Sequence, residues 1–223
     1  MQLPKESTHY SNITRFGRYL ARRLRRAGAE KASLAKDTLA ACMAVRAKGR
    51  EWEDTDDAVQ DALADRDASD DDLDVIAQNV RTTLLGRSVN AVKEEPYTSI
   101  FHAGLAYYTA ASLEDEESRY EELVERIVKH LAATDALRKS IPPAIKKGLA
   151  AFKAAASDLD KAERARGIAR TDLDRAMRNA LRQFEKAYGA ILSEDGKAAA
   201  ESYFPKSRGK TKDDKTPAPL PEE

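Results

Sequence analysis

The sequence predicts an all-α fold: an elongated antiparallel helical bundle built from two tandemly duplicated helical units related by a pseudo-twofold axis. Three observations lead to this prediction. Residues that favour helices, above all alanine, leucine and charged types, dominate the 223 residues. Apolar residues recur at steps of three and four, the period of one helix face. Residues 72–74 (Asp-Leu-Asp) and Asn79 also recur one hundred positions later, at 172–174 and Asn179.

The first half of the sequence predicts three helices. The first begins near Asn12 and ends at Gly28, because glycine often follows the last turn of a helix. The second covers about 30–66. The acidic run 65–72 is predicted to form a turn, with Asp71 as the N-cap of the third helix.

The second half repeats this plan. Ser112 is the predicted N-cap of a helix, and the prolines at 142–143 fit the first turn of the next helix, where a missing N–H costs nothing. Gly167 is predicted to end that helix. Thr171 and Asp174 then form a capping box for the last one.

Two series of apolar residues spaced by seven are predicted to anchor the core, each residue superposing on its equivalent one hundred positions later: Val45, Trp52 and Val59, and Ile145, Phe152 and Leu159. Trp52 and Phe152 are the largest of these side chains. Asn79 and Asn179 allow two interpretations: a hydrogen bond that fixes the register of the bundle, or a place on the flank of each helix.

The predicted domain organisation follows the repeat. Residues 1–9 form a flexible N-terminus, and residues 10–205 form a single helical-bundle domain. Repeat 1 covers about 10–107 and repeat 2 about 110–205. The tail 206–223 replaces apolar residues with lysine, aspartate, proline and glycine, so it is predicted to be disordered.

Charge and cysteine content narrow the function classes. The 38 basic and 38 acidic residues cancel, so net charge offers no argument for a polyanionic partner. Cys42 is the only cysteine, which excludes an intrachain disulfide and a CxxC site. No segment approaches the roughly 20 apolar residues of a membrane span, and residues 1–10 lack the apolar core of a signal peptide. The sequence predicts a cytoplasmic protein.

No motif predicts catalysis, a cofactor or a metal site. The sequence lacks GxSxG, a glycine-rich phosphate loop and HExxH. The acidic run 65–74 lacks the ligand order of an EF-hand, and Cys42 is interpreted as a small buried residue. We therefore predict a protein that is not an enzyme, and the sequence identifies no small-molecule substrate.

The first candidate interaction surface is a stripe of arginines on the first helix, opposite its apolar face: Arg15, Arg18, Arg22, Arg25 and Arg26. It is either a solvated face, a surface for an acidic protein partner, or a surface for phosphates of nucleic acid or membrane. No aromatic residue is expected to interleave with the arginines, so base stacking is not predicted.

The second candidate is the aromatic segment between the repeats, which contains Ile100, Phe101, Tyr107 and Tyr108. It either plugs one end of the bundle or forms an exposed docking patch.

The sequence thus favours a non-enzymatic helical scaffold or assembly protein that acts through protein–protein contacts, with a second copy of itself as a partner. In that version, the arginine stripe meets the acidic run 51–74 of another copy. The first alternative is a protein that binds nucleic acid or an anionic membrane surface through its first helix. The second is a metal- or ligand-binding helical bundle.

Overall fold

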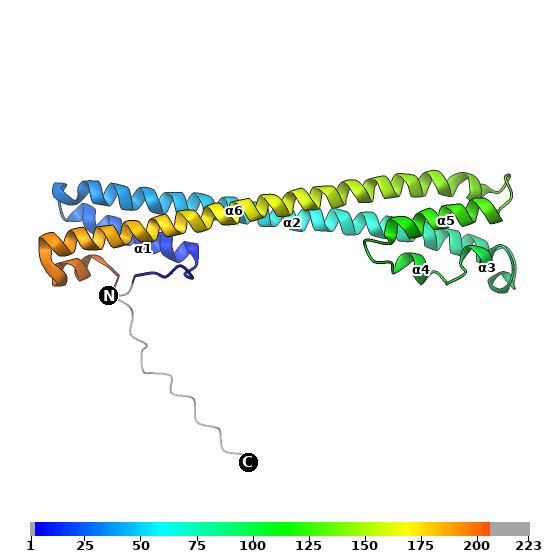
Figure 1. The fold of residues 1–223 in the computed structure, drawn as a ribbon, viewed down its shortest axis with the longest axis horizontal. Coiled ribbons are helices and arrows are strands. Elements are labelled where there is room, and N and C mark those ends of the chain that lie inside the picture. The colour runs from blue at the N-terminus through cyan, green and yellow to red at the C-terminus, as the bar shows by residue number, and fades with distance from the viewer. Residues whose placement is uncertain (1–2, 206–223) are drawn as a thin grey trace, which may run out of the picture. The chain divides into compact units, whose positions relative to one another are not determined.

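The computed structural model describes residues 3–205, and every regular element in that range is helical, which confirms the all-α prediction. The long and short α-helices, drawn in Figure 1, are α1 (Tyr10–Arg26), α2 (Ala32–Leu85), α3 (Tyr97–Ile100), α4 (Ala106–Thr109), α5 (Glu116–His130) and α6 (Ala136–Tyr203). Two 3-10 turns, η1 (Ala29–Lys31) and η2 (Ala91–Lys93), follow α1 and α2. None of the described helices is both long and apolar enough for a bilayer span.

The described chain divides into two compact units, each of which combines residues from both halves of the sequence. Unit 1 consists of residues 3–54 and 167–205, and unit 2 of residues 55–166. Helices α2 and α6 each contribute one part to either unit. The predicted single domain stays a prediction.

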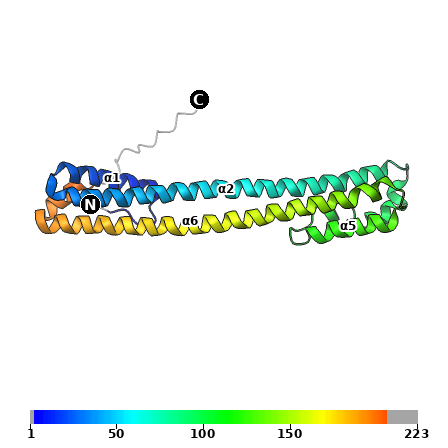
Figure 2. The ribbon, with the colours of Figure 1, turned by 90° about the horizontal axis from the view of Figure 1, so that it is seen from above.

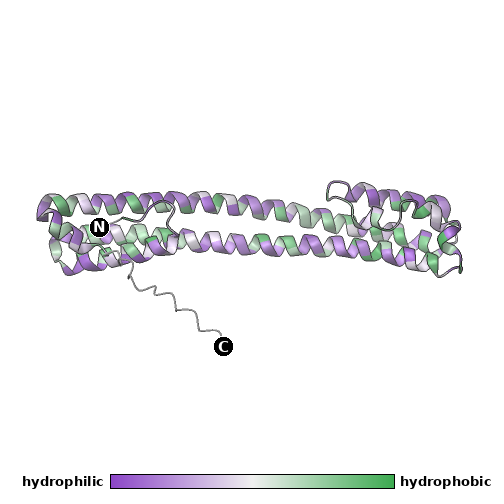
Figure 3. Ribbon diagram, turned by 90° about the horizontal axis from the view of Figure 1, so that it is seen from below, coloured by the Kyte–Doolittle hydropathy of each residue, from purple (hydrophilic) through white to green (hydrophobic). Residues whose placement is uncertain are grey.

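In unit 1, α1 packs beside the beginning of α2 and the end of α6, as Figures 1 and 2 both show. Ile13, Leu20 and Leu24 of α1 are fully buried and join one core with Val45 of α2 and Phe184 of α6. Hydrophilic and hydrophobic residues alternate along the helices (Figure 3), as helices with one buried face require.

Two glycines allow helix α1 to approach its neighbours closely. A Cβ atom at Gly17 would overlap the Cys42 sulfur and lie 2.7 Å from the Phe184 ring. A Cβ atom at Gly49 of α2 would overlap the ring of Tyr10 in the first turn of α1. Substitution at either position must therefore move α1 away from its neighbours.

In unit 2, α5 packs against the end of α2 and the beginning of α6. The core contains Leu73 of α2, Tyr120 and Ile127 of α5, and Ile145 and Phe152 of α6. The segment from η2 to α4 covers this core. As in unit 1, a short helix lies against parts of both long helices.

The predicted turn at 65–72 is wrong, because α2 continues unbroken from Ala32 to Leu85. The run contains no glycine or proline, and aspartate inside a helix costs at most about 0.7 kcal/mol relative to alanine. Between the buried Val59 and Leu73, the half-buried Leu63, Arg66 and Asp70 keep the same face of the helix turned inward. Packing therefore holds the helix intact, and Asp71 is an interior residue rather than an N-cap.

The boundaries predicted around α6 are also wrong. Both prolines at 142–143 lie inside the helix, beyond its first turn, since the helix begins at Ala136. Gly167 and Thr171 are interior too, and the Thr171 hydroxyl donates to the Gly167 carbonyl at 3.0 Å. The helical dihedral angles break only at Gly196, where φ is 81°. Gly167 therefore does not end the helix, because the residues before and after it remain packed in α6.

The observed ends of α1 and α5 lie closer to the predicted ones. Helix α1 ends at Arg26, two residues before Gly28, whose φ is 113°. His9 caps the beginning of α1, its ring accepting from the Ser11 amide at 3.3 Å. Helix α5 begins after Asp115 rather than at Ser112, whose hydroxyl accepts from the Asp115 amide in the preceding turn.

The predictions about individual side chains have mixed outcomes. Trp52 is only half-buried at the edge of the unit 1 core, whereas Phe152 is buried in unit 2. Asn79 and Asn179 are both exposed, so the flank interpretation holds and a register-fixing hydrogen bond does not. The predicted disordered tail, 206–223, lies outside the described residues.

Candidate functional site

The arginine stripe of α1 is an exposed surface of unit 1. Its five arginines (Arg15, Arg18, Arg22, Arg25 and Arg26) are all exposed, and α1 contains no acidic residue. None of the five forms an ion pair or a hydrogen bond with another side chain in the described range. Arg23 differs, because its guanidinium donates to the Ser202 carbonyl at 3.1 Å. The stripe therefore carries positive charge that unit 1 does not neutralise.

A groove of about 660 Å³ runs along this stripe, between α1 and α2. Arg18, Arg22, Arg25 and Arg26 line it, together with Tyr19. Tyr19 lies between Arg18 and Arg22 in the sequence and is 44% exposed, so the expectation that no aromatic residue interleaves with the arginines is wrong. The surface combines guanidinium groups with one aromatic ring.

The acidic run of α2 contains side chains with internal partners. Asp56 pairs with Arg166 at 3.2 Å, Asp67 with Arg66 at 2.6 Å, and Asp74 accepts from the Tyr120 hydroxyl at 2.7 Å. The Asp56 and Asp74 contacts join α2 to α6 and to α5, whereas the Asp67 pair joins sequence neighbours.

Other carboxylates of the same helix have no such role. Asp57, Asp61 and Asp65 lie on one exposed face of α2 in unit 2, and none of them has an ion pair or side-chain hydrogen bond in the described range. We call these three residues the aspartate row. Their spacing of four residues equals that of Arg18, Arg22 and Arg26 on α1.

The second candidate surface does not form an exposed patch. Ile100, Phe101 and Tyr108 are between 0% and 4% exposed and belong to the core of unit 2, while Tyr107 is half-buried. The Tyr108 hydroxyl donates to the Ile100 carbonyl at 2.7 Å. Of the two interpretations of this segment, burial favours the plug.

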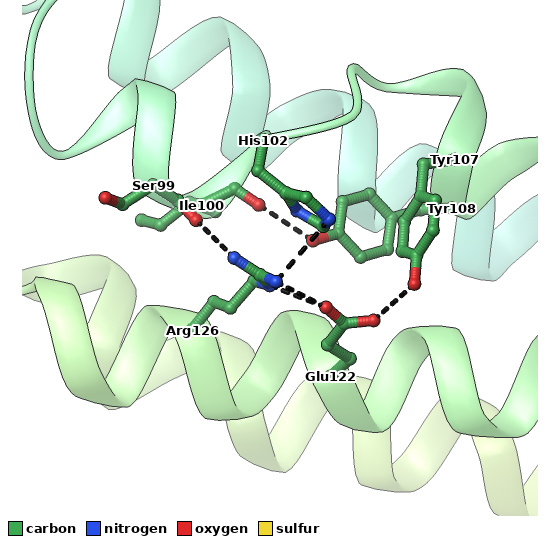
Figure 4. A network of polar contacts seen from close by, with 7 residues as sticks. All are labelled: Ser99, Ile100, His102, Tyr107, Tyr108, Glu122 and Arg126. Carbon is green, nitrogen blue, oxygen red and sulfur yellow. Dashed lines mark hydrogen bonds and ion pairs between the residues drawn. The ribbon is translucent and has the colours of Figure 1, made fainter.

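Helix α5 holds this aromatic cover in place through the polar network of Figure 4. Arg126 donates to the Ser99 carbonyl at 2.9 Å and pairs with Glu122 at 2.7 Å. Glu122 also accepts from the Tyr107 hydroxyl at 2.6 Å. The guanidinium of Arg119 lies 3.8 Å from the centre of the Tyr107 ring. The charged side chains beside this segment, Arg119, Glu122 and Arg126, thus have their partners within unit 2.

Unit 2 has a second groove, of about 690 Å³, between α5 and α6. Apolar residues including Val124 and Leu149 line it, with Glu121 and Glu125 from α5 and two lysines from α6. Its walls carry both charges, in contrast to the arginine groove of unit 1.

The structure offers little for nucleophilic or metal chemistry. Burial raises the pKa of the Cys42 thiol to about 11, so the thiol stays protonated at neutral pH. Among residues 3–205, no three histidine, cysteine, aspartate or glutamate side chains are arranged to hold a metal ion.

Sequence reasoning missed two buried ionisable side chains, Lys31 and Glu116. Lys31 pairs with Glu194 and Asp195 of α6. Glu116, at the beginning of α5, is only 2% exposed. In the sequence it is one of several acidic residues between Glu114 and Glu125, and only its place opposite α2 distinguishes it.

Comparisons with known proteins identify no relative: no family model, no curated protein and no solved structure matches the chain.

Proposed function

We propose that the protein is a non-enzymatic helical scaffold that assembles through protein–protein contacts, with the arginine stripe of α1 as its principal interface and the aspartate row of a second copy as the partner surface. The observation that carries this proposal is the unneutralised stripe itself. A helix with six arginines and no acidic residue is not needed for the packing of α1, whose buried positions are Ile13, Thr14, Gly17, Leu20, Ala21 and Leu24.

The matching spacing supports the choice of partner. Residues four apart on a helix are separated by about 6 Å along its axis. Arg18, Arg22 and Arg26 can therefore each face one aspartate of the row when two such helices lie side by side. On a neutral chain, this segregation of charge favours contacts between copies over contacts with a uniformly charged polymer.

Several ion pairs must act together to hold two copies, because each contributes little free energy. An exposed ion pair contributes about 0–1 kcal/mol, so one pair would not hold two copies together. Three pairs in register form a network, and screening weakens it as the Debye length falls from about 10 Å at 0.1 M salt to about 3 Å at 1 M.

Sedimentation velocity of the full chain across a concentration series tests the proposal. We expect association at about 0.1 M salt and its loss at about 1 M. The triple variant Arg18→Glu, Arg22→Glu, Arg26→Glu should be monomeric at low salt with unchanged helicity. A parent protein that stays strictly monomeric at low salt and high concentration would contradict self-assembly.

A matched control distinguishes a specific face from net charge. Arg178, Arg182 and Lys186 are exposed on α6 of unit 1 with the same spacing. Reversal of these three to glutamate changes the net charge equally and should leave association intact. Equal loss in both triple variants would show a general charge effect and remove the stripe as the interface.

The arginine groove favours one alternative function, the binding of nucleic acid. Guanidinium groups bind phosphates bidentately, and an exposed ring such as Tyr19 is a surface on which a base stacks. If the monomeric parent retards single-stranded nucleic acid, and Tyr19→Ala weakens binding, this alternative replaces the scaffold.

We further propose that the scaffold arose by tandem duplication and has a pseudo-twofold axis. The support is a shared pattern of burial: seven buried positions of α2 each have a buried equivalent one hundred residues later in α6, namely 45, 49, 59, 73, 77, 80 and 84 with 145, 149, 159, 173, 177, 180 and 184. Helices α1 and α5 are buried at the same steps of four, three and four, beginning at Ile13 and Glu116.

We also propose that the protein is cytoplasmic, since a reducing compartment suits the free thiol of Cys42.

A further inference from the structure

The first turn of α5 places a carboxyl group where a helix of this kind buries an apolar side chain. Glu116 begins the buried series of α5, which continues with Tyr120, Leu123 and Ile127. One of its carboxyl oxygens, Oε1, is buried and has no hydrogen-bond partner among the described residues. A buried polar atom without a partner is rare and costly, so its presence needs an explanation.

The surroundings of Glu116 are acidic. The Tyr120 hydroxyl donates to Asp74, and Glu116 and Asp70 each lie one turn before these residues. The Glu116 carboxyl therefore faces Asp70 as well as Asp74, and both add negative charge beside it. The nearby cation, Arg66, directs two hydrogen bonds to Asp67 instead. The other groups around this turn are also engaged: the Tyr120 hydroxyl with Asp74, and Lys153 of α6 with Glu117.

Two carboxyl groups in contact cannot both be ionised without strong repulsion, and a hydrogen bond between them requires that one of them carries a proton. We propose that Glu116 and Asp70 share one proton, and that loss of this proton as the pH rises releases the first turn of α5 from α2. The device is independent of the proposed function, because neither Glu116 nor Asp70 belongs to the arginine stripe or to the aspartate row.

The pH range in which the proton is lost follows from the shifted pKa of Glu116. Burial and, next, the hydrogen bond with Asp70 raise the pKa of Glu116 from its ordinary value of 4.5 to about 8. Between these values, the folded state keeps a proton that the unfolded chain has released. The stabilisation is therefore complete below pH 4.5 and is lost as the pH rises through about 8.

Unfolding by urea at a series of pH values between 5 and 9 tests the proposal on the full chain. The folding equilibrium of the parent should weaken with rising pH, by at most about tenfold per pH unit for one proton. Glu116→Gln keeps the size of the side chain and cannot titrate, so its curve should lack this component. Glu117→Gln, one residue away and half-exposed, should retain it.

A direct measurement keeps the test decisive if Glu116→Gln does not fold. The carbon-13 shift of the Glu116 carboxyl in the parent should titrate near pH 8, and amide exchange of α5, corrected for intrinsic rates, should accelerate above that pH. A midpoint near 4.5, or an undiminished pH dependence in Glu116→Gln, would overturn the proposal. So would millimolar Ca²⁺ that stabilises the parent at high pH and is without effect on Glu116→Gln, since the site would then bind a cation.

Discussion

The two short helices, α1 and α5, have the same buried spacing but opposite surface chemistry. Helix α1 presents six arginines without an acidic residue, whereas α5 carries five glutamates with two arginines and a lysine. Several charges of α5 have partners within unit 2, such as Glu117 with Lys153 and Glu122 with Arg126. The five arginines of the stripe on α1 have none in the described range. Packing fixes the buried positions of both helices, so the difference between them lies on their exposed faces.

The cores of the two units differ as well. In unit 1, α1 meets both long helices over glycines, Gly17 and Gly49, beside the buried rings of Phe184 and Phe204. In unit 2, the close glycine contact is between the long helices, Gly148 with Leu73, and more of the core is aromatic, with Tyr97, Phe101, Tyr108 and Tyr120. Helices that meet over glycines tolerate little added side-chain volume. A core filled by aromatic rings tolerates little loss of side-chain volume. Mutations at corresponding depths should therefore have different consequences in the two units.

The largest effect is expected at Phe152 of unit 2. Phe152→Ala should cost about 3–5 kcal/mol of unfolding free energy, because the side chain is buried. Trp52→Ala, at the equivalent position of unit 1, should cost less than half as much, since Trp52 is half-buried and lies near Arg170 at the surface. Urea unfolding followed by circular dichroism measures both. Equal costs would mean that the two positions are buried alike and that the contrast between the cores is wrong.

A smaller effect is expected at Gly17 of unit 1. Gly17→Ala should destabilise by about 1–3 kcal/mol, because the new methyl group overlaps Cys42 and presses on Phe184. Gly167→Ala is the matched control: its Cβ meets no other atom within 4 Å, and alanine should stabilise the helix by up to about 1 kcal/mol. A neutral Gly17→Ala would show that α1 has room to move and that unit 1 is not closely packed.

Much of this fold is readable from the sequence because helical periodicity is a local property. The apolar steps of three and four predicted α1, and Gly28 marked its end within two residues. The errors came from turn signals without packing context. The acidic run around Asp71 and the residues Gly167 and Thr171 resemble helix ends, yet both lie inside long helices because one face of each helix stays turned inward through them.

The candidate site was predicted only in part, for a similar reason. The arginine stripe is local to one helix, and the structure leaves it exposed as that pattern suggested. Which carboxylates of the acidic run are free depends on partners distant in sequence, such as Arg166 for Asp56. The contact between Glu116 and Asp70 joins residues 46 positions apart along the chain. Single-sequence patterns carry no information about such pairings.

A charge swap within one chain tests the central claim, that the arginine stripe of one copy binds the aspartate row of another. The variant Asp57→Arg, Asp61→Arg, Asp65→Arg should be monomeric at low salt in sedimentation velocity, like the triple glutamate variant of the stripe. Combining both sets of substitutions exchanges the two charges and should restore the association of the parent, with the same loss in high salt. If the combined variant stays monomeric, or if reversal of the aspartate row alone leaves association unchanged, the partner surface is not the aspartate row and the claim is wrong.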